Sequence, residues 1–324
     1  MNQTDTTSCC ASCGIAQVDD IKLKECTSCD LVRYCSDACL KEHESQHKED
    51  CKKRVAELRD ELLFKQPDSR HLGDCPICML PLQLDPKKSG MMMCCSKVIC
   101  KGCNFANQLD KEKYTMSSCC SKVICNGCNY ANQVREAERR LEESCPFCRE
   151  PIPSTKEECH KQAMKRVEAN DPVAMCGEGF LQYQKGDYSS AFEYSKKAAE
   201  LGYVGAHFML AGLYRDGHGV EMDEKKSIHH TEVAAIGGHP DARCNLAYYE
   251  ERNGDMKRAV RHLIIAATQG SDESIKSLMS TFKNGKVSKE VLAAALRAHQ
   301  AAVDATKSPQ RDVAEQKLSN ITTS

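Results

Sequence analysis

Apolar residues are patterned differently in the two halves of this 324-residue chain. In the C-terminal half they recur with small residues at helical spacing. In the N-terminal half the clearest helical pattern is confined to residues 52–70, which predict a short amphipathic linker helix ending at Pro67. Its apolar residues are Val55, Leu58, Leu62 and Leu63. We therefore expect a helical C-terminal half and an N-terminal half that depends on something other than a large apolar core.

An alanine-rich pattern occurs three times in the C-terminal half. It reads Ala-Ala-x-x-Gly-x-x-x-Ala-x-x-x-Leu at 198–210 and 234–246, and returns with serine in place of the third alanine at 266–278. Small residues suit positions where helices cross closely, and the glycine ends one helix before the next begins. Offsets of 36 and 32 residues between the copies are typical of helix-turn-helix solenoids.

We expect this solenoid to span residues 171–306. Asp171-Pro172 has the composition of a helix start, residues 171–201 predict a first helix pair, and residues 287–306 predict a capping helix. With the loop at 214–220, the alanine-glycine pattern resembles Sel-one-like repeats, relatives of the tetratricopeptide repeat, which implies a scaffold with a concave binding surface. Residues 307–324 are predicted to be disordered. The histidines of this region lack cysteine or carboxylate partners at ligand spacing, so we interpret them as surface or packing residues.

The 23 cysteines are unevenly distributed, because all but Cys159, Cys176 and Cys244 precede residue 150. The polar N-terminus does not resemble a signal peptide, and no apolar run approaches the roughly 20 residues of a membrane span. We therefore expect an intracellular protein, cytoplasmic or nuclear, whose cysteines bind metal rather than form disulfides. A net charge of −1 gives no sign of nucleic-acid binding. Aromatic residues make up only 5% of the chain, so zinc is expected to stabilise the N-terminal half.

Eight candidate zinc ligands occur in the first 51 residues. They are Cys10, Cys13, Cys26, Cys29, Cys35, Cys39, His47 and Cys51. The first two pairs have the two-residue gap of a zinc knuckle, whereas the last two pairs are spaced by four and share one face of a helical turn. Eight ligands imply two zinc ions.

Residues 9–51 resemble the MYND finger, including the Tyr34-Cys35-Ser36 step and the closing His47-x-x-x-Cys51. The resemblance implies interleaved ligand pairs, with the first and third pairs on one zinc and the second and fourth on the other. It also implies a module that docks short, often proline-containing peptides and does no chemistry. A role in stability alone is the alternative. Lysine methyltransferases with such fingers carry a SET domain, of which we find no sign. Cys9 is left over, as a spare thiol or an alternative ligand.

A cysteine-rich block, residues 94–118, is repeated as residues 119–143. Cys-Pro-Ile-Cys precedes the pair and Cys-Pro-Phe-Cys follows it, so we predict one zinc module. Its candidate ligands are Cys75, Cys78, Cys94, Cys95, Cys100, Cys103, Cys119, Cys120, Cys125, Cys128, Cys145 and Cys148. Twelve cysteines are present for the eight places of two ions. The extra block could bind a third zinc, could be an idle duplication that forms a loop with unused thiols, or could compete with its twin for the same ion.

Residues 71–153 resemble a RING-type domain in their opening and closing knuckles. They depart from it at the centre, where adjacent cysteines replace the usual cysteine and histidine. The resemblance implies recruitment of a ubiquitin-conjugating enzyme through Ile77, Pro146 and Arg149, and a ligase that needs no catalytic nucleophile.

We thus predict a multidomain protein: small zinc-stabilised α+β fingers followed by an all-α solenoid. The leading hypothesis is a zinc-dependent ubiquitin ligase whose finger and solenoid bind the substrate. The alternative is a non-enzymatic protein-interaction scaffold. Neither reading includes a membrane or nucleic-acid partner.

Overall fold

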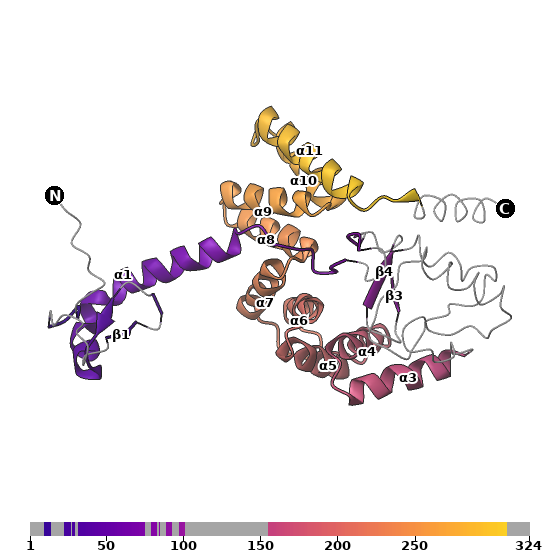
Figure 1. Cartoon of the computed structure of the whole chain (residues 1–324), viewed down its shortest axis with the longest axis horizontal. Coiled ribbons are helices and arrows are strands. Elements are labelled where there is room, and N and C mark those ends of the chain that lie inside the picture. The colour runs from indigo at the N-terminus through magenta and orange to yellow at the C-terminus, as the bar shows by residue number, and fades with distance from the viewer. Residues whose placement is uncertain are drawn as a thin grey trace. The chain divides into compact units, whose positions relative to one another are not determined.

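A computed structural model of the chain describes residues 10–13, 23–26, 28–29, 32–74, 79–82, 84, 89–92, 97–100 and 155–309 (Figure 1). The chain divides into two compact units, Met1–Lys65 and Gln66–Ser324. The predicted disordered tail, residues 307–324, lies almost entirely in residues 310–324, outside the described part.

The first unit contains a two-stranded sheet and one long helix. Strand β1 (Lys24–Glu25) pairs antiparallel with β2 (Arg33–Tyr34), and α1 (Asp37–Leu63) follows at once. Ser36 caps this helix: its backbone is extended and its hydroxyl accepts a hydrogen bond from the backbone N–H of Cys39 at 3.2 Å. An N-cap serine satisfies one of the N–H groups that a helix start leaves without an intrahelical partner.

The linker helix predicted over residues 52–70 differs from what the structure contains. The helix begins inside the finger at Asp37 and ends at Leu63, so it is one continuous element. The reason is physical: the ligand spacing of four already places His47 and Cys51 on a helix. Extending an existing helix avoids the cost of a new nucleus. Residues 66–74 are not helical and belong to the second unit.

The second unit contains a hairpin and an array of helices. Strand β3 (Ser89–Met92) pairs antiparallel with β4 (Lys97–Cys100), with Ser89 opposite Cys100. The array, residues 155–309, is called the repeat array below. Its helices are α3 (Lys156–Glu168), α4 (Pro172–Gln184), α5 (Tyr188–Glu200), α6 (Val204–Asp216), α7 (Glu224–Ile236), α8 (Pro240–Arg252), α9 (Met256–Thr268), α10 (Asp272–Lys283) and α11 (Lys289–Asp304).

Successive helices of the repeat array pack in pairs, α4 with α5, α6 with α7 and α8 with α9. Each pair then contacts the next through α5 and α6 or through α7 and α8. Asp171 caps α4 and Pro172 occupies its first turn, as predicted. α3, whose N-cap is Thr155, is a helix that the sequence analysis did not identify.

The three glycines of the repeated pattern terminate α5, α7 and α9. Gly202, Gly238 and Gly270 have φ of +81°, +85° and +87°, in the left-handed region that glycine occupies without a steric penalty. The predicted role of these glycines as helix terminators is therefore confirmed.

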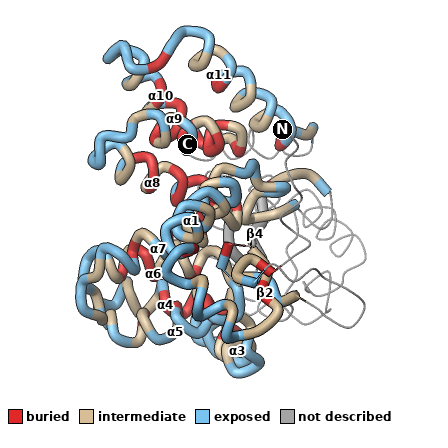
Figure 2. Tube along the Cα trace, turned by 90° about the vertical axis from the view of Figure 1, so that its left-hand side faces the viewer, coloured by how far each residue is buried: buried red, intermediate tan, exposed pale blue. Residues whose placement is uncertain are grey.

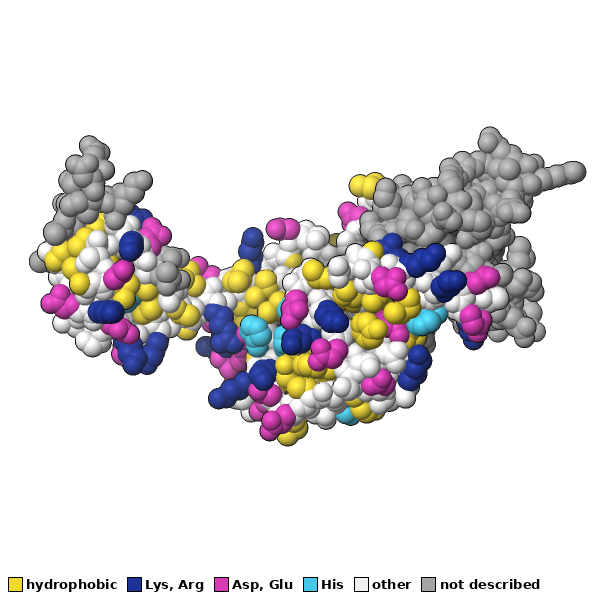
Figure 3. Space-filling model, turned by 90° about the horizontal axis from the view of Figure 1, so that it is seen from below, with side chains coloured by type: hydrophobic (Ala, Val, Ile, Leu, Met, Phe, Trp, Pro, Cys, Tyr) yellow, Lys and Arg dark blue, Asp and Glu magenta, His cyan; other side chains and the backbone are white. Residues whose placement is uncertain are grey.

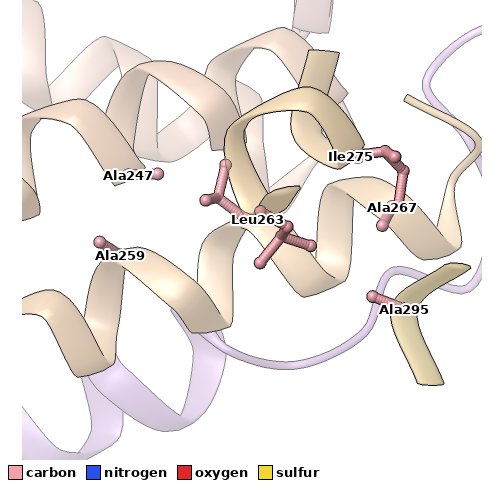
Figure 4. Close-up of a cluster of buried hydrophobic side chains, with 7 residues drawn as sticks. Ala247, Ala259, Leu263, Ala267, Ile275 and Ala295 are labelled. Carbon is pink, nitrogen blue, oxygen red and sulfur yellow. The ribbon is translucent and has the colours of Figure 1, made fainter. Parts of the chain in front are cut away.

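The core of the repeat array consists largely of alanine and leucine. Ala198, Ala206, Ala234, Ala242 and Ala266 are fully buried. One cluster joins α8 and α9 to the last two helices, and most of its residues are labelled in Figure 4. Buried positions lie where α8, α9 and α10 face one another (Figure 2). Small side chains let the helices approach closely, so each helix pair covers the apolar face of its neighbour.

Candidate metal centres

The first ligand set brings together Cys10, Cys13, Cys35 and Cys39. Their sulfur atoms all lie within 4.8 Å of one another. The Sγ atoms of Cys13 and Cys35 are 3.5 Å apart, and those of Cys35 and Cys39 are 3.6 Å apart. Four thiolates around a tetrahedral zinc would be about 3.8 Å apart, given Zn–S bonds of about 2.3 Å. This set therefore fits one zinc ion.

The second ligand set brings together Cys26, Cys29, His47 and Cys51. The Sγ of Cys29 lies 3.1 Å from Nε2 of His47, and the Sγ atoms of Cys26 and Cys51 are 3.9 Å apart. Cys29 is fully buried and His47 nearly so. Three thiolates and one imidazole are a common structural zinc set. Within the described residues, these are the two sets of three or more candidate ligands that come together.

The two sets interleave along the chain, as the resemblance implied. Backbone hydrogen bonds next to β2 bring the knuckles into place: the N–H of Ala11 donates to Arg33, and that of Cys26 donates to Val32, each at 2.9 Å. The helix then supplies Cys39, His47 and Cys51. A short sheet and one helix thus hold ligands that are up to 41 residues apart in sequence.

Two ring-bearing residues support the candidate ligand His47: Tyr34, which the sequence indicated only as part of the MYND motif, and His43, which it did not indicate. Tyr34 is buried, and its hydroxyl lies 3.1 Å from Nδ1 of His43. The ring of His43 stacks on that of His47 at a centroid distance of 6.0 Å. His43 precedes His47 by one helical turn, so its spacing of four was the available signal. Side chains of this kind hold a ligand ring in the orientation that the metal requires.

Two thiols of the finger are prepared for ionisation. Burial by itself would raise the pKa of Cys10, but backbone hydrogen bonds from Cys13, Cys35 and Ser12 lower it to about 6. Burial likewise opposes ionisation of Cys26, whereas hydrogen bonds from the Ser28 backbone and from His47 lower its pKa to about 6. In the same two sets the pKa of Cys35 is raised to about 12, mainly by hydrogen bonds with Cys13 and Cys39, and that of Cys51 is raised to about 12, mainly by burial. The thiolate is the form that ligates zinc, so Cys10 and Cys26 favour metal binding, whereas binding at Cys35 and Cys51 must displace a proton.

The candidate ligands of the RING-like module fall mostly outside the described residues. Cys100 is at the end of β4, and only the backbone pairing of that strand is described. The others stay predictions, as do the conjugating-enzyme contacts Ile77, Pro146 and Arg149. The candidate zinc ligands outside the described residues are Cys75, Cys78, Cys94, Cys95, Cys103, Cys119, Cys120, Cys125, Cys128, Cys145 and Cys148. Cys9 also lies outside the described part.

The described residues form a groove in the first unit and a cavity in the second. In the first unit, a groove of about 620 Å³ runs beside the zinc ligand His47 and is lined by Gln46, Asp50, Lys53 and Arg54. In the second unit, a cavity of about 420 Å³ is lined mainly by apolar residues, including Phe180, Tyr203, Phe208 and Met209. His71 and Leu72, from the segment before the RING-like module, also line this cavity.

The histidines of the repeat array do not form a zinc set among the described residues. His262 is fully buried, and burial lowers its pKa to about 3, with Arg243 adding to the effect. His207 and His230 approach with their Nδ1 atoms 3.0 Å apart, and burial together with the neighbouring histidines lowers the pKa of His230 to about 4. These contacts agree with the packing role that the sequence predicted.

Known protein families match both the finger and the repeat array. Residues 10–51 match the MYND finger, and residues 174–203, 204–239 and 240–271 match the Sel1 repeat. The repeat boundaries fall next to the glycine turns after α5, α7 and α9.

Individual relatives match only parts of this chain. An exopolysaccharide production negative regulator from Rhizobium leguminosarum bv. viciae is 36% identical over 63 residues, which are 19% of this chain. The matched segment spans only 24% of that protein's length. A Sel1 repeat protein from Oxalobacter formigenes has 25% identity and a TM-score of 0.40, covering 52% of this chain and 50% of the other. The Escherichia coli protective antigen c5321, with an SLR fold, has 21% identity and a TM-score of 0.37. The match covers 52% of this chain and 37% of the other.

None of the helices in the described residues combines the length and apolarity that crossing a bilayer requires.

Proposed function

We propose a bivalent role for this chain, which its MYND finger and Sel1 repeats identify as a zinc-binding protein-interaction adaptor. One protein partner binds the finger and a second binds the repeat array. The observation that carries the proposal is the pair of ligand sets, each with four protein ligands. Zinc sites with four protein ligands are structural, because no coordination position is open to water or substrate.

The finger offers a peptide-binding surface beside its second ligand set. The groove at His47 is lined by both signs of charge, from Asp50, Glu57, Lys53 and Arg54. Arg54 donates to Glu57 and Glu61, at 3.4 and 3.0 Å. A groove of this kind suits a short peptide that carries polar or charged positions. We propose that it takes the proline-containing peptides that the resemblance to MYND fingers implies.

The surface charge supports protein partners. On the face of the repeat array in Figure 3, lysine, arginine and carboxylate side chains are interspersed, and neither sign dominates the described part of that face. The net charge of the chain is −1. A nucleic-acid-binding protein normally gathers its basic residues on one surface.

The test of the finger's role is a screen of proline-containing peptides against the full chain. Selected peptides should lose binding when Cys26→Ser disrupts the second zinc set, while the helical circular dichroism of the repeat array persists. Cys159→Ser is the matched control, because this cysteine lies outside both ligand sets. Peptides that bind the Cys26→Ser protein as well as the unaltered one would overturn the finger's role.

A second candidate function is that of a ubiquitin ligase, supported by the RING-like spacing of residues 71–153. In this proposal the RING-like module recruits a ubiquitin-conjugating enzyme, and the finger and the repeat array bind the substrate. Purified protein with a panel of conjugating enzymes should build ubiquitin chains, and Ile77→Ala or Arg149→Ala should stop the reaction. Cys244→Ser, in the repeat array, should leave it unchanged. No activity with a broad panel would leave the adaptor without enzymatic function.

The zinc content tests the RING-like module directly. Native mass spectrometry should find four zinc ions per chain if one copy of the duplicated block is idle, and five if both copies bind. Two ions, the number that the finger alone accommodates, would overturn the RING-like module while leaving the adaptor role intact.

A further inference from the structure

A short segment ahead of the RING-like module lies on the repeat array. Residues Ser69–Leu72, called the strap below, follow the end of α1 by a few residues and belong to the same unit as the repeats. The backbone N–H of His71 donates to the carbonyl of Gly238 at 3.2 Å. The side-chain amide of Gln269 donates to the same carbonyl at 2.9 Å. The strap therefore pairs with backbone that the repeat array itself holds in place.

His71 is the central anchor of the strap. Its ring stacks on that of His239 at a centroid distance of 4.1 Å, and His239 stacks in turn on Phe208 at 4.2 Å. His239 is 8% exposed. The result is a three-ring stack whose outer member comes from the strap and whose other members come from α6 and from the N-cap of α8.

Arg70 is the second anchor of the strap. Its guanidinium donates to the carbonyl of Ala302 at 2.6 Å and to that of Leu82 at 3.1 Å. Ala302 lies in the last turn of α11, where backbone carbonyls lack intrahelical partners and the helix dipole favours a cation. Arg70 thus supplies a donor and a positive charge to a C-terminal carbonyl of α11, the last helix of the repeat array.

The absence of a side chain at Gly238 lets the backbone of the strap approach the repeat array closely. A Cβ atom on Gly238 would lie 2.7 Å from the carbonyl oxygen of Ser69 and 3.2 Å from the N–H nitrogen of His71. A Cβ on Gly202, the equivalent glycine one repeat earlier, would meet nothing within 4 Å. The two glycines have nearly the same φ, so they differ in their contact with the strap and not in backbone conformation.

The strap leaves part of this surface unfilled. The cavity of about 420 Å³ beside His71 and Leu72 is lined largely by aromatic and apolar side chains. It is larger than one leucine side chain needs, so a larger apolar residue at the Leu72 position has room to bind.

From these contacts we propose that the strap is an intramolecular ligand that occupies a peptide-binding site of the repeat array. The partner is a protein with an extended segment of the same chemistry: a basic residue, then a histidine or another aromatic ring, then an apolar residue. It binds by displacing the strap. This inference rests on the adaptor function and names the chemistry of the partner on the repeat array.

The first experiment measures whether the strap is held. Gly238→Ala places a methyl group against the strap, whereas Gly202→Ala introduces the same backbone strain without that contact. Trypsin cleavage after Arg70, followed by mass spectrometry on the folded full chain, reports release. Cleavage should be at least tenfold faster in Gly238→Ala than in Gly202→Ala. Equal rates in the two variants would overturn the proposal.

The second experiment measures whether the site binds a peptide in trans. The probe is a fluorescent peptide of residues 66–74. It should bind the Arg70→Ala/His71→Ala chain about tenfold or more tighter than the unaltered chain, because the tethered strap competes at high effective concentration. A tryptophan in place of Leu72 should tighten the peptide about tenfold further by burying more apolar surface. A peptide with alanine at positions 70 and 71 is the control.

The outcomes separate this proposal from the adaptor function. Equal affinity of the probe for the opened and unaltered chains, or no binding to the opened chain, would overturn the strap proposal. Binding of proline-containing peptides to the finger would be unaffected by either result, so the adaptor function fails or stands on its own test.

Discussion

The finger and the repeat array reach a stable fold by different physical means. In the finger, the few buried residues are mainly metal ligands and their supports, such as Cys10, Cys29, Tyr34 and His47. In the repeat array, buried residues are alanines and leucines that recur with the repeat. The finger therefore concentrates its stability in two ions, whereas the repeat array spreads it over many small contacts. We therefore expect the finger to be lost with its metal and the repeat array to keep its fold without metal.

The largest expected effect is the loss of the finger on zinc removal. A strong chelator should expose the backbone amides of the finger to hydrogen exchange, because each structural zinc contributes on the order of 10–16 kcal/mol of apparent binding free energy. The repeat array should keep its protection. Mass-spectrometric hydrogen exchange on the full chain measures both regions at once. Loss of protection in both regions together would contradict the separation.

A smaller but still large effect is expected from a single core residue of the repeat array. Leu278 is fully buried in the cluster of Figure 4, so Leu278→Ala should lower the free energy of unfolding of the array by about 2–5 kcal/mol. Leu296→Ala, at a site 40% exposed in α11, is the matched control and should cost far less. Urea denaturation measures both. Zinc content should not change, and a change would show that the two regions depend on one another.

Acid should weaken the repeat array by a moderate amount through His262. Its pKa falls from 6.5 to about 3 on folding, mainly because the ring is buried. The unfolded chain binds the proton more readily, so this contribution is complete above pH 6.5 and is lost as the pH falls toward 3. About 2 kcal/mol should be lost between pH 7 and pH 5. Urea titrations at the two pH values measure it, and His262→Gln should reduce the difference. An unchanged pH dependence in that variant would contradict the assignment.

The smallest expected effect comes from one helix cap. Asp171 accepts hydrogen bonds from the N–H groups of Val173 and Ala174, at 2.9 and 3.3 Å, and pairs with Arg166. Asp171→Ala should cost about 1 kcal/mol of array stability. Asp171→Asn keeps the capping oxygen but removes the negative charge, so it measures the contribution of the ion pair separately from that of the cap. If the asparagine variant loses as much as alanine, the ion pair rather than the cap is the source of the stability.

Much of the fold was predictable because its determinants are local. Ligand spacings of two and four specify knuckles and helical turns, and Ala-Ala-x-x-Gly specifies a helix end followed by a close helix crossing. Those patterns located the finger and the repeats, whereas the interleaving of the ligand pairs was implied by the resemblance to MYND fingers. The same local view missed α3, and it separated residues 52–70 from the helix that begins at Asp37. The apolar spacing of residues 52–70 could not show that their helix begins at Asp37, because the first half of that helix carries mainly polar residues and candidate zinc ligands.

The supporting residues of both sites were harder to predict because they depend on distant contacts. Tyr34 and His43 acquire their role only when β2 lies against α1. Arg70 meets Ala302 across 232 residues. A histidine pair such as His71 and His239 has no ligand spacing and no local signature.

By itself, the sequence determined which eight residues are the candidate zinc ligands of the finger and where glycines end the repeated helices. Metal coordination and glycine turns act over a few residues, so their spacing is visible along the chain. Only the tertiary structure decided that Gly238, unlike the equivalent Gly202, lies against the backbone of the strap, and that Arg70 donates to a carbonyl in the last turn of α11. Those roles arise from groups far apart in sequence, and no local pattern records which of several equivalent positions will be covered.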